Sequence, residues 1–128
     1  YSDPHMQTMS AATLEKDDVV VAISQSGRTK DLLHSMQVAQ DQGAKVISLS
    51  PPNTPVSDRA DIPIFVHINE DTDVFTPMTS RIAHLLVIDC LAVGVAQSKG
   101  PEFEDHLARI KDSIASLRLT EVNTKQSR

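Results

Sequence analysis

The sequence predicts an α/β fold of three layers, α/β/α, built on a mainly parallel sheet. Short apolar runs typical of buried strands, such as Val19–Ile23, alternate with segments whose apolar residues recur at helical spacing. The Val19–Ile23 run is continuous, which is typical of strands covered on both faces. Short turns join the segments, as in βαβ units, so a parallel sheet is expected.

Seven elements are expected, and turn or cap residues bound most of them. Ser2 or Asp3 caps the first helix with Pro4 in its first turn, and Gly43 ends the second. A proline-rich break over 50–55 separates the second strand from the third. The elements are a helix over 4–12, a strand over Val19–Ile23, a helix over 30–42, strands over Lys45–Leu49 and Ile62–Ile68, and helices over 77–98 and 102–119.

The helix over 77–98, with Thr76 as its cap, is apolar around much of its circumference. Such a helix is buried centrally or lies in a subunit interface, so at least a homodimer is expected. Gly100 and Pro101 end it. The domain is expected to cover 1–119, followed by a polar tail over 120–128.

Composition limits the function classes. The 128 residues carry a net charge of −5 and no Trp, which argues against a nucleic-acid grip or a base-stacking platform in this chain. Cys90 is the single cysteine, expected as a small core residue, so no disulfide forms within the chain. No apolar run approaches the ~20 residues that span a bilayer. A cytoplasmic protein without a membrane partner is the expectation.

The segment Ser24-Gln25-Ser26-Gly27-Arg28-Thr29 lies between a predicted strand and a predicted helix. The first N–H groups of a helix have no internal partner, and the helix dipole adds partial positive charge there. Gly27 permits a tight turn, while three hydroxyls and the Gln25 amide add donors. A plain N-cap needs only one hydroxyl. The segment therefore predicts a phosphate site formed by Ser24, Gln25, Ser26, Gly27 and Thr29, with Arg28 directed to solvent.

This motif, S-x-S-G-x-T, resembles the phosphate loop of SIS (sugar isomerase) domains. The similarity continues through residues 30–33, 43–47, 60–63 and 80–85 and covers about residues 1–98. Within that superfamily the sequence most resembles the RpiR-type transcriptional regulators, among them the hexose-catabolism repressors (HexR).

The resemblance implies a sugar-phosphate-sensing effector domain without catalysis, cofactor or metal of its own. It also implies 2-keto-3-deoxy-6-phosphogluconate as the effector, and operator DNA contacts only through a helix-turn-helix domain that is absent from this chain. The resemblance further implies that the first βα unit of the SIS order does not precede Val19–Ile23 here, so this strand is expected at a sheet edge. The alternative class is an aldose–ketose phosphate isomerase of the same superfamily.

An isomerase needs a base, and no motif identifies one here. The candidates are His34, His67, Glu70, His84 and His106. Ser80 and Arg81 are weaker ligand candidates: Arg81 can bind a carboxylate, or it can pair equally well with the acidic segment 70–73. That segment lacks the glycine and register of a calcium loop, so it is expected to be a solvated loop.

Overall fold

The protein is described from a computed structural model that covers residues 2–69, 78–100, 105 and 108–112. The chain divides into two compact units, 1–87 and 88–128. The predicted segments at 70–77 and 113–128, and the residues Glu70, Thr76 and His106, lie outside the described residues.

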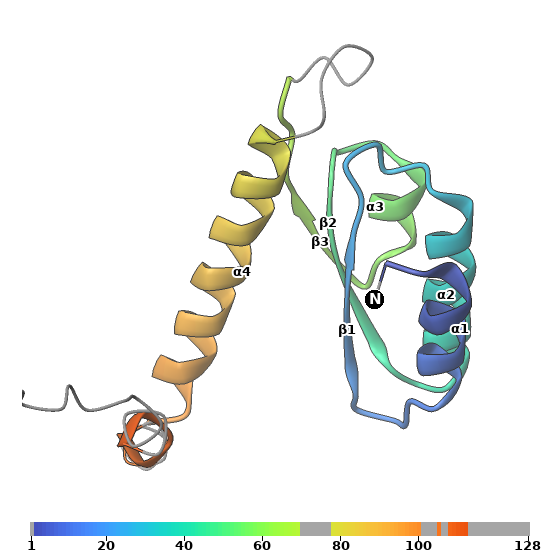
Figure 1. The fold of residues 1–128 in the computed structure, drawn as a ribbon. Helices are drawn as coiled ribbons and strands as arrows, with labels where there is room; N and C mark the ends of the chain where they lie inside the picture. The colour runs from blue at the N-terminus through green and yellow to red at the C-terminus, as the bar shows by residue number, and fades with distance from the viewer. Residues whose placement is uncertain (1, 70–77, 101–104, 106–107, 113–128) are drawn as a thin grey trace, which may run out of the picture. The chain divides into compact units, whose positions relative to one another are not determined.

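The first unit contains a three-stranded parallel sheet of order β1-β2-β3 (Figure 1). The pairing places Val20 opposite Val46 and Ile47 opposite Ile62. The α/β class with a parallel sheet is therefore confirmed. The elements in chain order are α1 (Pro4–Ala12), β1 (Val19–Ile23), α2 (Lys30–Asp41), β2 (Lys45–Ser50), α3 (Pro55–Arg59), β3 (Ile62–Phe65) and α4 (Thr79–Ser98).

Helices α1, α2 and α3 lie on one side of this sheet (Figure 1). Side chains alternate between the faces of a strand, so one set from each strand points toward these helices. The resulting core is small-residue-rich, and its buried members are Ala11, Ala22, Met36, Ala39, Ala44, Val46 and Val56. The close packing of these residues fixes where each strand end, and therefore each loop, is placed.

The opposite set on β1 is not covered: Val19, Val21 and Ile23 are exposed. Strand β1 is also an edge of the sheet, as the sequence predicted. A cavity of about 340 Å³ runs beside it between α1 and α2. The other edge strand, β3, is also poorly covered, with Ile62 and Phe65 exposed.

Boundaries of four elements, α2, β2, β3 and α4, differ from the prediction, and one helix was missed. Strand β3 ends at Phe65, three residues short of the expected Ile68, so His67 is exposed beyond the strand. Strand β2 runs one residue further, to Ser50, because Val66 N–H donates to the Ser50 carbonyl at 3.0 Å. Helix α3 was not predicted. The described part of the final predicted helix, residues 105 and 108–112, is helical.

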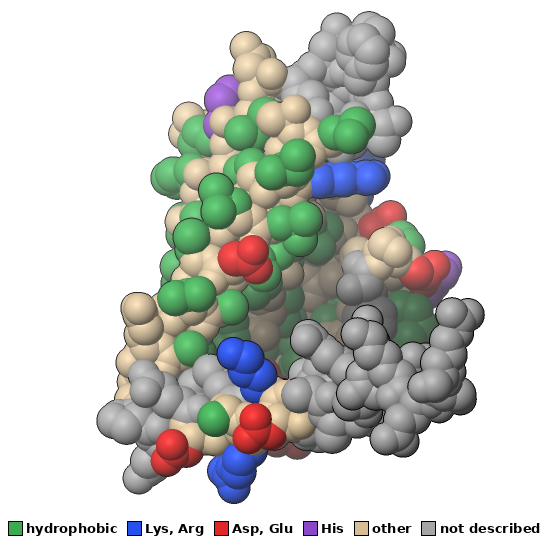
Figure 2. Space-filling model, turned by 60° about the vertical axis from the view of Figure 1, so that its left-hand side comes forward, with side chains coloured by type: hydrophobic (Ala, Val, Ile, Leu, Met, Phe, Trp, Pro, Cys, Tyr) green, Lys and Arg blue, Asp and Glu red, His purple; other side chains and the backbone are tan. Residues whose placement is uncertain are grey.

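Helix α4 begins at Thr79, two residues later than predicted, and ends at the expected Ser98. Only Ser80 and His84 of this helix are buried, and apolar side chains are exposed along it (Figure 2). Cys90 is exposed, so its expected place in the core is wrong: it lies on a helix that is apolar all round and mostly uncovered. By length and composition α4 could cross a bilayer, contrary to the expectation from the sequence.

Candidate functional site

The predicted phosphate loop connects β1 to α2 at the carboxyl end of the sheet. The Ser24 N–H donates to the Leu49 carbonyl at 3.0 Å, which extends the pairing of β1 with β2 to the first loop residue. Thr29 is the N-cap of α2, yet its side chain makes no capping hydrogen bond. The first turn of α2 is therefore not capped by Thr29, which is the residue a plain N-cap would use.

The loop hydroxyls are bonded to one another and to the loop backbone. The Gly27 N–H donates to Ser24 Oγ at 3.0 Å, and Ser24 Oγ lies 3.1 Å from Thr29 Oγ1. The Arg28 N–H donates to Ser26 Oγ at 3.3 Å. These hydrogen bonds link Ser24 to Gly27 and Thr29, and separately link Ser26 to the Arg28 N–H.

Burial separates the loop residues into two kinds. Ser24 is 5% exposed and Gly27 is buried, whereas Ser26 and Thr29 are exposed and Gln25 is half-buried. Buried Ser24 therefore stabilises the turn through its hydrogen bonds to the Gly27 N–H and to Thr29 Oγ1. Ser26 and Thr29 present their hydroxyls at the surface, where an anion can reach them. Arg28 is exposed, as predicted.

The loop also rests against α3, the helix that was not predicted from the sequence. The Val56 N–H donates to the Gly27 carbonyl at 3.0 Å, and Thr54 caps α3 beside Gly27. A sequence signal existed: Thr54 followed by Pro55 and Ser57 has the form of an N-cap, a first-turn proline and a capping partner. The helix is only five residues long, too short for apolar periodicity to reveal it.

The weaker ligand candidates lie in the first turn of α4. Ser80 is fully buried and Arg81 is exposed. Arg81 makes no ion pair within the described part of the chain, and its alternative partner segment, 70–73, lies outside it. The structure therefore groups the five loop residues, whereas Ser80 and Arg81 stay predictions as ligands.

The histidines differ in burial. His34 on α2 and His67 are exposed, whereas His84 is only 7% exposed. Burial lowers the pKa of His84, and its Nε2 has no hydrogen-bond partner among the described residues. The described residues contain no group of three or more His, Cys, Asp or Glu that could hold a metal ion. Within the described residues, no hydrogen bond joins a histidine to the loop.

The family follows from a comparison with known proteins. A family model described as the SIS domain matches residues 1–94. The chain belongs to the SIS-domain family. The resemblance that the S-x-S-G-x-T motif indicated is thereby confirmed, and the matched region contains the loop and all three strands of the sheet.

Two relatives of this SIS domain are named HTH-type transcriptional regulator HexR. The domain is 42% identical to the one from Escherichia coli (strain K12) over 119 residues, which are 92% of this chain and 41% of that protein. It is 38% identical to the one from Pseudomonas aeruginosa over 117 residues, 91% of this chain and 41% of that protein. The SIS domain thus spans about two-fifths of the length of the curated relatives it matches.

Solved structures share the fold. The Vibrio vulnificus NanR protein complexed with ManNAc-6P superposes with a TM-score of 0.80 at 26% identity, over 94% of this chain and 46% of that one. An Escherichia coli CFT073 protein gives a TM-score of 0.63 at 24% identity, over 73% of this chain and 53% of that one. The second likeness concerns the fold alone.

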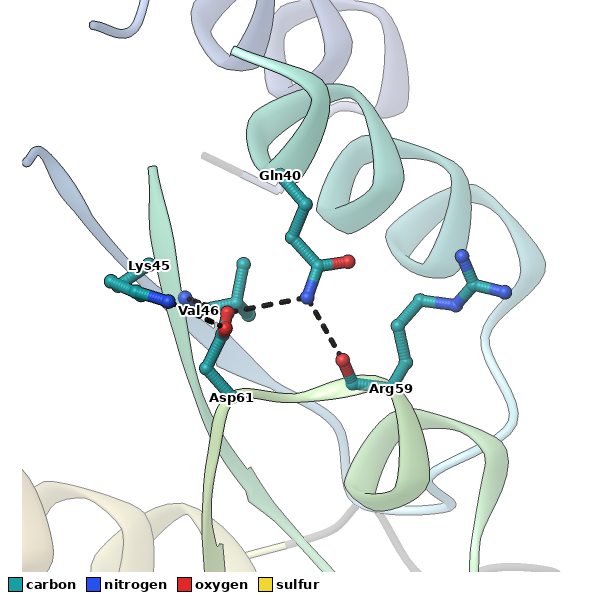
Figure 3. A network of polar contacts seen from close by, with 5 residues as sticks. All are labelled: Gln40, Lys45, Val46, Arg59 and Asp61. Atoms are coloured by element: carbon teal, nitrogen blue, oxygen red, sulfur yellow. Dashed lines mark hydrogen bonds and ion pairs between the residues drawn. The ribbon is translucent and has the colours of Figure 1, made fainter. Parts of the chain in front are cut away.

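At the amino end of its sheet this SIS domain has a different polar site, centred on Asp61 (Figure 3). Asp61 Oδ2 accepts from the Val46 N–H at 2.9 Å and from Gln40 Nε2 at 3.2 Å, and Lys45 Nζ lies 3.2 Å from Oδ1. Gln40 Nε2 also donates to the Arg59 carbonyl at 3.0 Å. The Val46 hydrogen bond, followed by those from Gln40 and Lys45, lowers the pKa of Asp61. The network joins α2, β2 and the end of α3.

Proposed function

We propose that this chain is the sugar-phosphate-sensing effector domain of a bacterial transcriptional regulator of carbohydrate catabolism. In this proposal the loop Ser24–Thr29 holds the phosphate of the effector. One observation carries it: the N-terminus of α2 has no side-chain cap, while the exposed hydroxyls of Ser26 and Thr29 lie beside it. Uncapped N–H groups with nearby hydroxyls match the acceptor oxygens of a phosphate.

The similar proteins support the regulatory part of the proposal. The relatives at 42% and 38% identity are named as HTH-type transcriptional regulators. NanR, at 26% identity, was solved with a phosphosugar, ManNAc-6P. We propose 2-keto-3-deoxy-6-phosphogluconate as the effector here, and contact with operator DNA through a part of the protein outside this sequence. The chain itself carries a net charge of −5, which disfavours a duplex.

The proposed role is binding without catalysis. Isomerisation needs a base at the open-chain sugar, and none of the described histidines forms a hydrogen bond with the loop. The proposal places this chain in the cytoplasm and requires no cofactor. Incubation with aldose and ketose phosphates, followed by detection of interconversion, tests this part. If the wild type interconverts these sugar phosphates and Ser26→Ala does not, the chain is an isomerase and the sensor proposal is wrong.

Phosphate binding by the loop is tested by titration calorimetry. Glucose 6-phosphate and 2-keto-3-deoxy-6-phosphogluconate are titrated into the wild-type chain and into Ser26→Ala/Thr29→Ala. A hydrogen bond to a charged group is worth roughly 1.5–3 kcal/mol, so the double variant should bind more than about tenfold more weakly. Glucose, which lacks the phosphate, should not bind to the loop.

The matched control is Thr13→Ala/Ser98→Ala. Both of these residues are exposed, and each hydroxyl donates to the carbonyl three residues earlier, at 2.9 and 2.8 Å. Their loss should leave the affinity for sugar phosphates unchanged. Equal affinity in the loop variant and this control would remove the loop from the binding site.

We also propose that α4 forms a homodimer interface. Ile82 and Leu86 lie one turn apart on α4 and are 66% and 63% exposed, which is costly for a monomer in water. Sedimentation should give a dimer at micromolar concentration for the wild type and a monomer for Ile82→Glu/Leu86→Glu. Gln97→Glu, an exposed polar position on the same helix, should remain dimeric. A wild-type monomer would contradict the interface.

A further inference from the structure

We infer that Thr54 is a positioning residue for the phosphate loop. Together with the Val56 N–H, it holds the Gly27–Arg28 peptide so that the Arg28 N–H faces the bound anion. The inference rests on the proposed function and adds to it a residue from another element, α3, that contacts no ligand in this scheme. The observation behind it is the close approach of the α3 cap to Gly27.

Thr54 fills the space in which a side chain at position 27 would lie. A Cβ built on Gly27 would be 2.2 Å from Thr54 Oγ1, 2.5 Å from Thr54 Cβ and 2.7 Å from Thr54 Cγ2. Gly27 also has φ of +65°, a conformation that L side chains rarely adopt. Two features therefore exclude any residue but glycine at position 27: the positive φ of its backbone and the Thr54 side chain packed against it.

The Thr54 side chain is held in place by several hydrogen bonds. Its Oγ1 donates to the Pro51 carbonyl at 2.9 Å and accepts from the Ser57 N–H at 3.4 Å. Its N–H donates to Ser57 Oγ at 3.0 Å, and Ser57 Oγ donates to the Thr54 carbonyl at 2.8 Å. Both residues are buried. A buried side chain with these partners does not rotate away without leaving polar groups unpaired.

The orientation of the loop peptide follows from a third contact. The Val56 N–H donates to the Gly27 carbonyl at 3.0 Å, so that carbonyl points at α3. In a trans peptide the C=O and the following N–H point in opposite directions, and the described chain has no cis peptide. The Arg28 N–H is therefore turned away from α3, into the loop, where it meets Ser26 Oγ. A bound phosphate oxygen would take that donor.

The inference is tested by measuring the affinity for inorganic phosphate and for glucose 6-phosphate in three variants of the full 128-residue chain. Thr54→Val keeps the shape of the side chain but loses the hydroxyl, and its affinity should fall about tenfold, the equivalent of one charge-assisted hydrogen bond. Thr54→Ser keeps the hydroxyl and should stay within about threefold of the wild type. Thr13→Val removes an exposed hydroxyl that bonds to the Ser10 carbonyl, away from the loop, and should not change affinity.

A purely structural role would lower the melting temperature of Thr54→Val but leave the affinity of the folded protein unchanged. That outcome, at a temperature where every variant is folded, would overturn the inference. Amide hydrogen exchange supplies a readout that needs no ligand. The Val56 N–H should exchange at least about tenfold faster in Thr54→Val than in Thr13→Val, because its bond to Gly27 loosens.

The two proposals fail in different ways. If the folded wild type binds neither phosphate probe, the proposed function falls, and the exchange of the Val56 N–H still decides whether Thr54 positions the loop. If the wild type binds and Ser26→Ala/Thr29→Ala does not, while Thr54→Val binds normally, the loop is the site and Thr54 plays no part in it. Unchanged exchange at Val56 in Thr54→Val overturns the inference in either case.

Discussion

The two ends of the sheet are held by different chemistry. At the carboxyl end, the loop Ser24–Thr29 is closed by neutral hydroxyls and by a glycine with positive φ. At the amino end, the carboxylate of Asp61 gathers a backbone N–H, an amide and an ammonium group. Both ends connect segments that are distant in the sequence, yet only one of them exposes hydroxyls that a ligand can use.

The comparison indicates that one end of the sheet serves ligand binding and the other end serves stability. The donors at that end, the Val46 N–H, Gln40 Nε2 and Lys45 Nζ, already bond to Asp61, whose negative charge would repel a second anion. The loop hydroxyls bond to one another and to the loop's own backbone N–H groups, and such bonds can be exchanged for bonds to a phosphate at little cost. Changes at the carboxyl end should therefore alter affinity, and changes at the amino end should alter stability alone.

The largest effect is expected for Gly27→Ala, because the new Cβ would overlap Thr54. Positive φ and overpacking together should cost about 2–4 kcal/mol in the free energy of unfolding. Phosphate binding should be lost with it. Urea denaturation and calorimetry measure the two effects.

Gly100→Ala is the matched control, since Gly100 has φ of +73° but no atom of the described residues lies within 4 Å of its added Cβ. It carries the backbone cost without the overlap and should lose about 1 kcal/mol with normal binding. Equal losses in the free energy of unfolding for Gly27→Ala and Gly100→Ala would show that the Thr54 side chain does not restrict the loop.

A smaller effect is expected for Asp61→Asn, and it should appear only in stability. The amide keeps one acceptor but loses the charge that Lys45 and the Val46 N–H contact, so the urea midpoint should fall while the affinity for glucose 6-phosphate stays unchanged. Asp89→Asn removes the same charge from an exposed position on α4 and should leave both quantities unchanged. A weaker affinity in Asp61→Asn would show that the two ends are coupled.

The pH dependence of this effect has a definite sign. The hydrogen bond from Val46 lowers the pKa of Asp61 in the folded state, so its contribution is complete above the unperturbed pKa of about 3.9. The contribution is lost as the pH falls through the lower folded pKa. The stability difference between wild type and Asp61→Asn should be constant between about pH 5 and 7 and shrink below about pH 4. A difference that grew on acidification would contradict the network.

The smallest effect is expected at His84. Burial lowers its pKa in the folded state, so the unfolded chain takes up a proton first as the pH falls below about 6.5. The wild type should therefore lose stability from about pH 7 to 5 by an amount that His84→Gln does not lose. The pH profile of the urea midpoint measures it, with His34→Gln, at an exposed site, as the control. Parallel profiles for wild type and His84→Gln would show that burial does not lower the pKa of His84.

The sequence by itself determined the α/β class, the approximate positions of the three strands and the loop Ser24–Thr29 between β1 and α2. These features are local: continuous apolar runs, cap residues and the S-x-S-G-x-T motif each lie within a few neighbouring residues. They also sufficed for the SIS family, which the family comparison confirmed. The proposed ligand residues rest on the same local motif and stay a prediction: Ser24, Gln25, Ser26, Gly27 and Thr29.

Only the tertiary structure decided which residues support that loop. Thr54 contacts Gly27, and Asp61 bonds to Val46. Each pair lies far apart in the sequence, so local hydrophobic patterns could not predict that the two residues meet. The exposure of Cys90 was likewise beyond the sequence, because an all-apolar helix has no face that marks where its partner lies. Local patterns specify which elements form, whereas packing between distant elements decides which side chains meet.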